Sequence, residues 1–294
     1  MSVVLIWSTT WIAMKDALSV IDPLAFMSAR FGLITALAWI VILLRRSRFN
    51  SLAIGRSDWR RLVIGSLIGY SAYQLCSVFA LDHSSVFTIS LLIALVPLFT
   101  MVMMFAMGEV LPPLGWPGLG LAVLGTVIFL ADKRQSGETL LGAVLSLGAA
   151  ISFAAYGLVN RPLVRKYPSD LLAAWQLLIG TIPMLLIGAA AIAGQEWTGL
   201  TGRIWLGLIF VIIFPVYVAY QLWNYAISRR GAAVASSYGL LVPILSAVMA
   251  AILFDEQITW LKTVGAAIAI GGLLLIRAPV SWRPAAMRRM TAPW

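Results

Sequence analysis

The sequence predicts an all-α membrane protein in which ten transmembrane helices form two inverted five-helix repeats around a central cavity. Of the 294 residues, 61% are hydrophobic and only 11% are charged, whereas a soluble domain is typically about 25% charged. Apolar stretches of about 20 residues, the length that spans a bilayer, recur along the whole chain. A polar pattern in the first half also returns in the second, which indicates an internal repeat.

The predicted spans fill the chain and leave no room for a separate soluble domain. In order, they are residues 2–18, 23–44, 61–81, 84–107, 113–131, 140–159, 170–193, 204–227, 231–254 and 260–277. The first repeat is expected over residues 1–133, the second over residues 138–278, and a basic cytoplasmic tail over residues 279–294.

Short polar breaks bound the spans of the first repeat. Asp22 separates the first span from the second, and the arginine-rich segment 45–61 separates the second from the third. Asp82 follows the third span, Glu109 follows the fourth, and the segment 132–138 follows the fifth. Because a charged side chain at the bilayer centre is costly, we expect each of these positions at a membrane surface.

The breaks of the second repeat are the segments 161–170, 196–203, 229–230 and 255–256. All eleven acidic residues of the chain therefore fall in breaks or at span ends. A proton-coupled carrier usually has a carboxylate or a histidine in its interior. We therefore expect the substrate to move down its gradient, or to be coupled through another group.

Basic residues are concentrated in alternate breaks. The breaks after the second, sixth and eighth spans, together with the C-terminal tail, hold 15 of the 21 Lys and Arg residues, and the opposite set holds five. By the positive-inside rule, both termini are expected in the cytoplasm of a bacterial inner-membrane protein. This orientation accounts for the net charge of +10, so we expect the lipid bilayer and no nucleic acid as a partner.

The chain lacks the residues that most cofactor sites and hydrolytic enzymes use. The single cysteine, Cys76, excludes a disulfide framework and a thiolate metal cluster, and is expected to fill apolar space. The sole histidine, His83, falls in an outer break. We expect no metal ion, no cofactor and no enzymatic activity, because hydrolysis needs a nucleophile with a base or paired acids. A monomer or a weak homo-oligomer is expected.

A polar stripe of four residues occurs twice, shifted by 147 positions. Their spacing of i, i+3, i+4 and i+7 places them on one face of a helix. In lipid, such a face must point at protein or at water. The stripe either lines a substrate path, which we favour, or bonds neighbouring helices at about 1 kcal/mol or less per contact. Its members are Tyr70, Tyr73, Gln74 and Ser77, followed by Tyr217, Tyr220, Gln221 and Asn224.

The repeat extends beyond this stripe. The segment from Pro97 to Glu109 aligns with the segment from Pro243 to Glu256. Because five spans are an odd number, the second copy must enter the membrane with reversed polarity, as in secondary transporters whose site lies where the halves meet. Pro97 and Pro243 are expected to kink the fourth and ninth spans and to act as hinges. Further corresponding pairs are Trp7 with Phe153, Lys15 with Arg161, Arg30 with Gln176, Gly118 with Gly265, and Gly125 with Gly272.

These residues resemble the EamA branch of the drug/metabolite transporter superfamily. The resemblance covers the whole chain and is carried by Trp7 and Ser8 with Lys15 eight residues later, by Arg30, and by the paired proline-to-glutamate segments. It implies ten helices in two inverted repeats, a central cavity and export of amino acids or related metabolites. Phe153 is a departure, because many second repeats of the family have tryptophan there.

Arg30 is the most informative single residue, because it alone among the cations lies deep in a span. A cation there costs at least about 2.5 kcal/mol and needs a partner or water. It either binds a substrate carboxylate, pairs with Asp16 or Asp22, or extends outward to the surface. Lys15 is expected to anchor its helix at the membrane interface.

Further residues are expected to line the cavity. Tyr156 and Asn160 share a helix face at i and i+4. Trp7 is expected to face the cavity, with lipid contact as the alternative, and Ser237 and Tyr238 open the ninth span. The sequence thus predicts an alternating-access exporter of a small molecule, most directly an amino acid that is neutral or aromatic. The alternatives are an exporter of other amphipathic metabolites or drugs, and a channel-like membrane protein.

Overall fold

A computed structural model describes residues 2–49, 51–109, 114–132, 139–219, 222 and 238–277, and these form helices with short connections. The first half contains α1 (Ser2–Leu18), α2 (Pro23–Leu44), η1 (Arg46–Arg48), η2 (Arg56–Asp58), α3 (Trp59–Ser66), η3 (Leu67–Ala72), α4 (Tyr73–Asp82), α5 (Val86–Ala94), α6 (Val96–Ala106) and α7 (Gly115–Ala131). The second half contains α8 (Leu140–Asn160), α9 (Ser169–Gly194), α10 (Gly202–Ile213), η4 (Phe214–Val218), α13 (Leu241–Phe254) and α14 (Trp260–Arg277).

The helical prediction is confirmed for the described residues, of which none forms a strand. By length and composition, five helical segments suffice to cross a membrane, and shorter apolar helices accompany them. The long segments are Pro23–Leu44, Arg56–Asp82, Val86–Ala106, Leu140–Asn160 and Ser169–Gly194. The predicted third span is therefore one continuous segment, and the arrangement of ten helices in inverted repeats stays a prediction.

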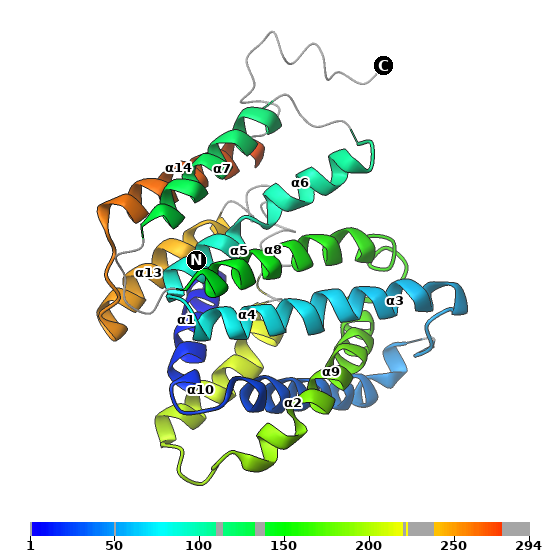
Figure 1. The fold of residues 1–294 in the computed structure, drawn as a ribbon. Helices are drawn as coiled ribbons and strands as arrows, with labels where there is room; N and C mark the ends of the chain where they lie inside the picture. Colours follow the sequence, from blue (N-terminus) through cyan, green and yellow to red (C-terminus); the bar gives the residue numbers. More distant parts are fainter. Residues whose placement is uncertain are drawn as a thin grey trace.

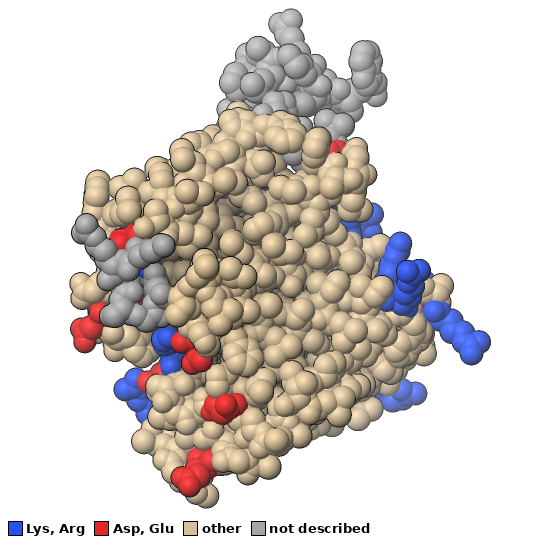
Figure 2. Space-filling view, viewed as in Figure 1, with Lys and Arg blue, Asp and Glu red and all other residues tan. Residues whose placement is uncertain are grey.

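The helices pack in pairs drawn from both halves of the chain. α7 and α14 lie side by side, α2 crosses α9, and α8 lies against α4, α5 and α6 (Figure 1). Figure 2 shows a group of Lys and Arg at the end of the molecule where α3 begins, and most Asp and Glu, together with a few Lys and Arg, at the other end. We call the first of these the basic end and the second the acidic end.

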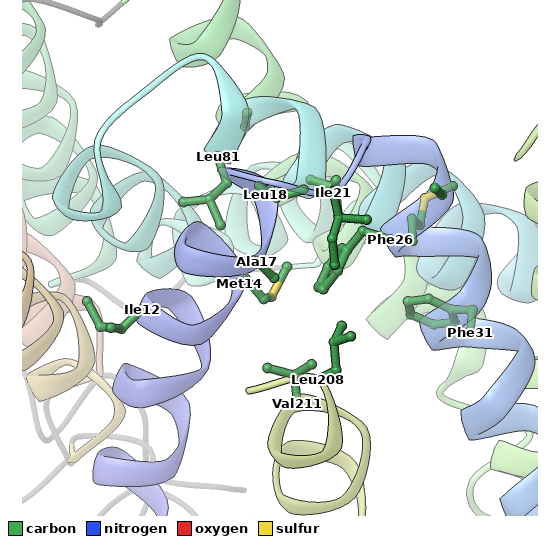
Figure 3. Close-up of a cluster of buried hydrophobic side chains, with 14 of the residues drawn as sticks. Ile12, Met14, Ala17, Leu18, Ile21, Phe26, Phe31, Leu81, Leu208 and Val211 are labelled. Atoms are coloured by element: carbon green, nitrogen blue, oxygen red, sulfur yellow. The ribbon is translucent and has the colours of Figure 1, made fainter. Parts of the chain in front are cut away.

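The largest apolar core surrounds α1 toward the acidic end. Met14 and Ala17 of α1 point between Phe26 of α2 and Leu208 and Val211 of α10 (Figure 3). All five side chains are buried. Large apolar residues on the outer helix faces remain exposed, as is expected for a protein that is surrounded by lipid.

Glycines hold α7 and α14 at backbone contact. A Cβ atom added at Gly125 would lie 2.2 Å from the nitrogen of Ala269, and one at Gly118 would lie 2.8 Å from the oxygen of Gly272. A Cβ at Gly265 would lie 2.8 Å from the oxygen of Gly125. Small residues permit such close packing where lipid supplies no hydrophobic force between helices.

Several of the apolar helices depart from regular α-helix along their length. η3 and η4 are π-helical turns that begin at Leu67 and Phe214, 147 residues apart. The predicted fourth span breaks at Leu95, two residues before Pro97, which has no N–H to continue the helix. α13 likewise begins only after Leu240, shortly before Pro243. Both prolines thus follow a helix break, and their role as hinges stays a prediction.

We predict that Gly125→Ala lowers the thermal stability of the purified protein, because the added methyl group collides with the α14 backbone. Such overpacking costs about 1 to 3 kcal/mol. Gly120→Ala on the same helix is the matched control, because a Cβ there meets nothing within 4 Å. Melting curves of both variants in detergent measure the effect, and equal melting temperatures would contradict the close contact.

Candidate functional site

Aromatic rings from the third and sixth predicted spans form a cluster inside the molecule. The ring centroids of Tyr73 and Phe153 lie 5.0 Å apart, and those of Phe153 and Tyr156 lie 5.8 Å apart. Tyr70 packs edge-on against Tyr156 at 5.8 Å. The cluster therefore brings together two members of the first polar stripe with Tyr156 from α8.

The π-helical turn η3 determines how Tyr70 joins this cluster. The stripe is not a regular α-helical row, because Tyr70 lies inside η3 and the other three members lie in α4. Two glycines admit the tyrosine rings. A Cβ at Gly69 would lie 2.3 Å from the ring of Tyr156, and one at Gly180 would lie 2.5 Å from the Cβ of Tyr70. Because π-turns often mark functional sites, this turn is a site feature that the sequence reasoning missed.

Tyr156 of this cluster forms a closed ring of hydrogen bonds with two amide side chains, Asn160 and Gln176. Tyr156 Oη donates to Gln176 Oε1 at 3.0 Å, Asn160 Nδ2 donates to Tyr156 Oη at 3.0 Å, and Gln176 Nε2 donates to Asn160 Oδ1 at 2.8 Å. Gln176 is only 1% exposed. Tyr156 and Asn160 do share a face, and that face binds α9. Gln176 was not predicted as a site residue, although the repeat alignment already paired it with Arg30.

Arg30 is buried in the interior with few polar contacts. Its side chain donates weakly, from Nε to the oxygen of Val211 at 3.4 Å and from Nη1 to the sulfur of Met14 at 3.6 Å. Its guanidinium lies 5.5 Å from the centre of the Phe31 ring. These contacts leave most of its donors without a strong acceptor, although Arg carries five N–H groups.

Neither predicted acidic partner reaches Arg30. Asp16 instead binds Arg203 at 2.6 Å, and Asp22 accepts from the amides of Leu24 and Ala25 to cap α2. Both carboxylates are occupied at helix ends, which is the physical reason that they do not pair with the interior cation. Among the described residues, no acidic side chain lies within ion-pair distance of Arg30.

The rest of the first stripe differs in how well its polar groups are satisfied. Ser77 is buried, and its hydroxyl donates to the oxygen of Tyr73 within the same helix. Tyr73 lies within electrostatic range of Arg30. Gln74 is half-buried, and its amide makes no hydrogen bond with another described residue. Arg30 and Gln74 are thus interior polar groups with spare bonding capacity, and the buried hydroxyl of Ser246, which has no hydrogen-bond partner, is another.

A lateral cleft of about 460 Å³ lies beside Arg30, between α2, α9 and α10. Arg30 is the one charged residue among those that line it. Several of the lining side chains are more than a third exposed on the outer surface. The lining residues are Ser28, Ala29, Arg30, Gly32, Leu33, Leu185, Ile192, Trp197, Trp205, Leu208, Ile209 and Ile212.

The remaining predicted site residues are placed as follows. Trp7 is half-buried on α1, and Tyr238 is exposed. The side chains that fall outside the described residues are those of Tyr217, Tyr220, Gln221, Asn224 and Ser237. Among the described residues, no group of three His, Cys, Asp or Glu side chains could hold a metal ion.

Comparisons with known proteins agree with this architecture. The sequence model of the EamA-like transporter family matches residues 1–131 and again residues 140–278. A probable amino-acid metabolite efflux pump of Escherichia coli K12 is 24% identical over 96% of this chain and 95% of its own. A probable terminal-alkyne amino-acid exporter of Streptantibioticus cattleyicolor is 27% identical over 74% of this chain and 73% of its own. One solved crystal structure shares the fold with a TM-score of 0.63, at 22% identity over 94% of each chain.

We predict that Tyr156→Phe destabilises the protein, because it leaves the buried amides of Gln176 and Asn160 each short of one hydrogen bond. A buried group left unsatisfied costs about 1 to 3 kcal/mol. Tyr238→Phe removes the same hydroxyl from an exposed ring and is the control. The melting temperatures of both variants in detergent give the measurement. An unchanged value for Tyr156→Phe would mean that water reaches these amides.

Proposed function

The chain belongs to the EamA-like transporter family, and from this membership we propose that it exports amino acids, neutral or aromatic, by alternating access. It is a multi-pass inner-membrane transporter of small molecules. The observation that carries the choice of substrate is the buried Arg30, which has no acidic partner among the described residues. A carboxylate is the group that such a cation binds best.

The site supplies a distinct contact for each part of an amino acid. Arg30 grips the carboxylate, and the spare amide of Gln74 serves a polar group of the substrate, either the amine or the second carboxylate oxygen. The rings of Tyr73 and Phe153 offer apolar faces to the side chain. Relatives named as amino-acid metabolite efflux pumps and an amino-acid exporter support this substrate class.

The two matches to the family model support two inverted repeats, over residues 1–133 and 138–278. The helix contacts are consistent with a two-fold relation between them. α1 packs on α10 and α13, and its counterpart α8 packs on α4 and on α5 with α6. The contact of Gly118 with Gly272 becomes that of Gly265 with Gly125 when each residue is replaced by its repeat partner. The central cavity then lies where the repeats meet.

We assign the basic end to the cytoplasm by the positive-inside rule, which also places both termini and the tail from residue 279 there. Export then carries the substrate from the basic end to the acidic end. The prolines that follow the breaks at Leu95 and Leu240 act as hinges, because a broken helix bends at lower cost than a continuous one.

A second candidate, export of larger amphipathic metabolites or drugs, is favoured by the lateral cleft. The lining of this cleft is mostly apolar, so it suits the apolar part of an amphipathic molecule that enters between α2, α9 and α10. The two candidates differ in whether the carboxylate of the substrate is required.

We predict that Arg30→Met abolishes exchange of labelled amino acids in proteoliposomes, because the substrate carboxylate loses the buried cation that binds it. Arg30→Lys retains a charge without a bidentate grip and is expected to lose about tenfold in kcat/KM. Arg165→Met, an exposed arginine in the connection after α8, is the control. Amines that lack the carboxylate should not compete in the wild-type protein. Competition by such amines would favour the second candidate.

We predict that Gln74→Leu lowers kcat/KM by about tenfold, which corresponds to the loss of one hydrogen bond of about 1.4 kcal/mol. The side chain has no described protein partner, so the melting temperature should be unchanged. Gln257→Leu, at an exposed position after α13, is the matched control. Normal exchange by Gln74→Leu would remove this residue from the site.

A further inference from the structure

At the acidic end, Lys15 of α1 binds the connection between α4 and α5. Its Nζ donates to the oxygen of Leu81 at 2.7 Å and to the oxygen of Ser84 at 3.0 Å. Leu81 lies in the last turn of α4, where carbonyl groups lack helical partners and favour a cation. Lys15 therefore ties α1 to the end of α4, which differs from the simple interfacial anchor that the sequence predicted.

Glu256, which follows α13, binds the other side of the same connection. Its carboxylate accepts from the amide of Val86 at 2.9 Å and from the amide of Phe87 at 3.5 Å. These are the first amides of α5, where a helix favours an anion. Of the two carboxylates near Lys15, those of Glu256 and Asp82, Glu256 attracts its ammonium group more strongly. Together, Lys15 and Glu256 join the ends of α1 and α13 through one short segment of backbone.

A simpler contact of the same kind occurs at the basic end. Arg161, which ends α8, donates from Nη1 to the carboxylate of Glu109 at 3.1 Å. Glu109 follows α6, and both side chains are 40% or more exposed. This pair joins the end of α8 to the end of α6.

The two contacts are counterparts in the repeat. The sequence alignment pairs Lys15 with Arg161 and Glu109 with Glu256. A cation and a carboxylate therefore lie at each end of the molecule, at the ends of the first and ninth predicted spans and at the ends of the sixth and fourth. They form a direct ion pair at the basic end and bind one backbone segment from two sides at the acidic end. In a transporter built from inverted repeats, the inward-open and outward-open states differ by an exchange of conformation between the two repeats. A contact that closes the outer end in one state therefore has a counterpart that closes the inner end in the other state.

We propose that Lys15 with Glu256 and Arg161 with Glu109 are the outer and inner gates of the transport cycle, each made by one cation and one carboxylate. The proposal rests on the proposed transport function. In this structure, the outer gate is the firmer one, because its charges make four hydrogen bonds to backbone groups and lie beside the apolar core around α1. The inner gate is one exposed ion pair. Export then requires the outer contacts to break while the inner pair is retained and buried.

The experiment measures access to the interior from each side and needs no substrate. The native cysteine is first removed by Cys76→Ser. A new cysteine is then introduced by Gln74→Cys, and its rate of labelling shows how easily an impermeant maleimide reaches the interior. Right-side-out and inside-out vesicles expose the outer and inner ends respectively. Glu256→Gln or Lys15→Gln should raise labelling from outside at least threefold. Glu109→Gln or Arg161→Gln should raise labelling from inside by a similar factor.

The matched controls are Asp255→Asn beside Glu256 and Arg165→Gln near Arg161, which should leave both labelling rates unchanged. The proposal is overturned if the gate variants label like these controls, if each variant raises labelling from both sides equally, or if no variant is labelled from either side. Melting temperatures identify variants that fail to fold, and the two substitutions per gate keep each arm measurable. Counterflow of amino acids tests the transport function separately.

Swapping the cation and the carboxylate within each gate tests how the two gates differ in their contacts. The double variant Glu109→Arg with Arg161→Glu should return inside labelling to the wild-type rate, because the inner pair binds only itself. The double variant Lys15→Glu with Glu256→Lys should not restore outside labelling, because carbonyl groups would then face an anion and amides a cation. Restoration at the outer end would contradict the backbone contacts of that gate.

Discussion

The structure depends on one constraint, that a chain in hydrocarbon must satisfy its polar groups within itself. Serine hydroxyls mostly meet it locally, as Ser66 and Ser146 do by donating to carbonyl groups one turn earlier. The ring of Tyr156, Asn160 and Gln176 meets it between helices. Arg30, Gln74 and the buried hydroxyl of Ser246 are described interior groups that do not. The spare donors and acceptors of Arg30 and Gln74 are therefore the strongest indication of where a polar substrate binds.

Glycine packing and interrupted helices are the two backbone features on which the proposed alternating access depends. Glycine contacts between α7 and α14 bring the two backbones together and fix one side of the molecule. The π-turns interrupt the spans that carry the polar stripe. The breaks at Leu95 and Leu240 lie against α7 and α14, in one apolar cluster with Ala122 and Leu273. The proposed hinges therefore sit beside the closely packed helix pair.

Much of this architecture could be predicted from sequence, because hydropathy, charge asymmetry and internal similarity are properties of neighbouring residues. The helical fold follows from them, as does the correspondence of Gly118 with Gly265 and of Gly125 with Gly272 in the repeat, but not the contact of these glycines between α7 and α14. The rest depends on tertiary contacts. Helical spacing placed Tyr70 on a regular face, but a π-turn moved it against Tyr156. Gln176 and the two bonds of Lys15 involve residues 16 or more positions away, which no local pattern reports.

The proposed function depends on Arg30, whose guanidinium is expected to bind the carboxylate of the substrate. An experimental structure with a bound amino acid, chosen as the tightest ligand in a panel of labelled compounds, tests it most directly. We expect the carboxylate of the bound amino acid within hydrogen-bond distance of the Arg30 guanidinium, with the side chain of the ligand against Tyr73 and Phe153. A ligand bound elsewhere, while Arg30 keeps only Val211, Met14 and Phe31 as neighbours, would contradict it.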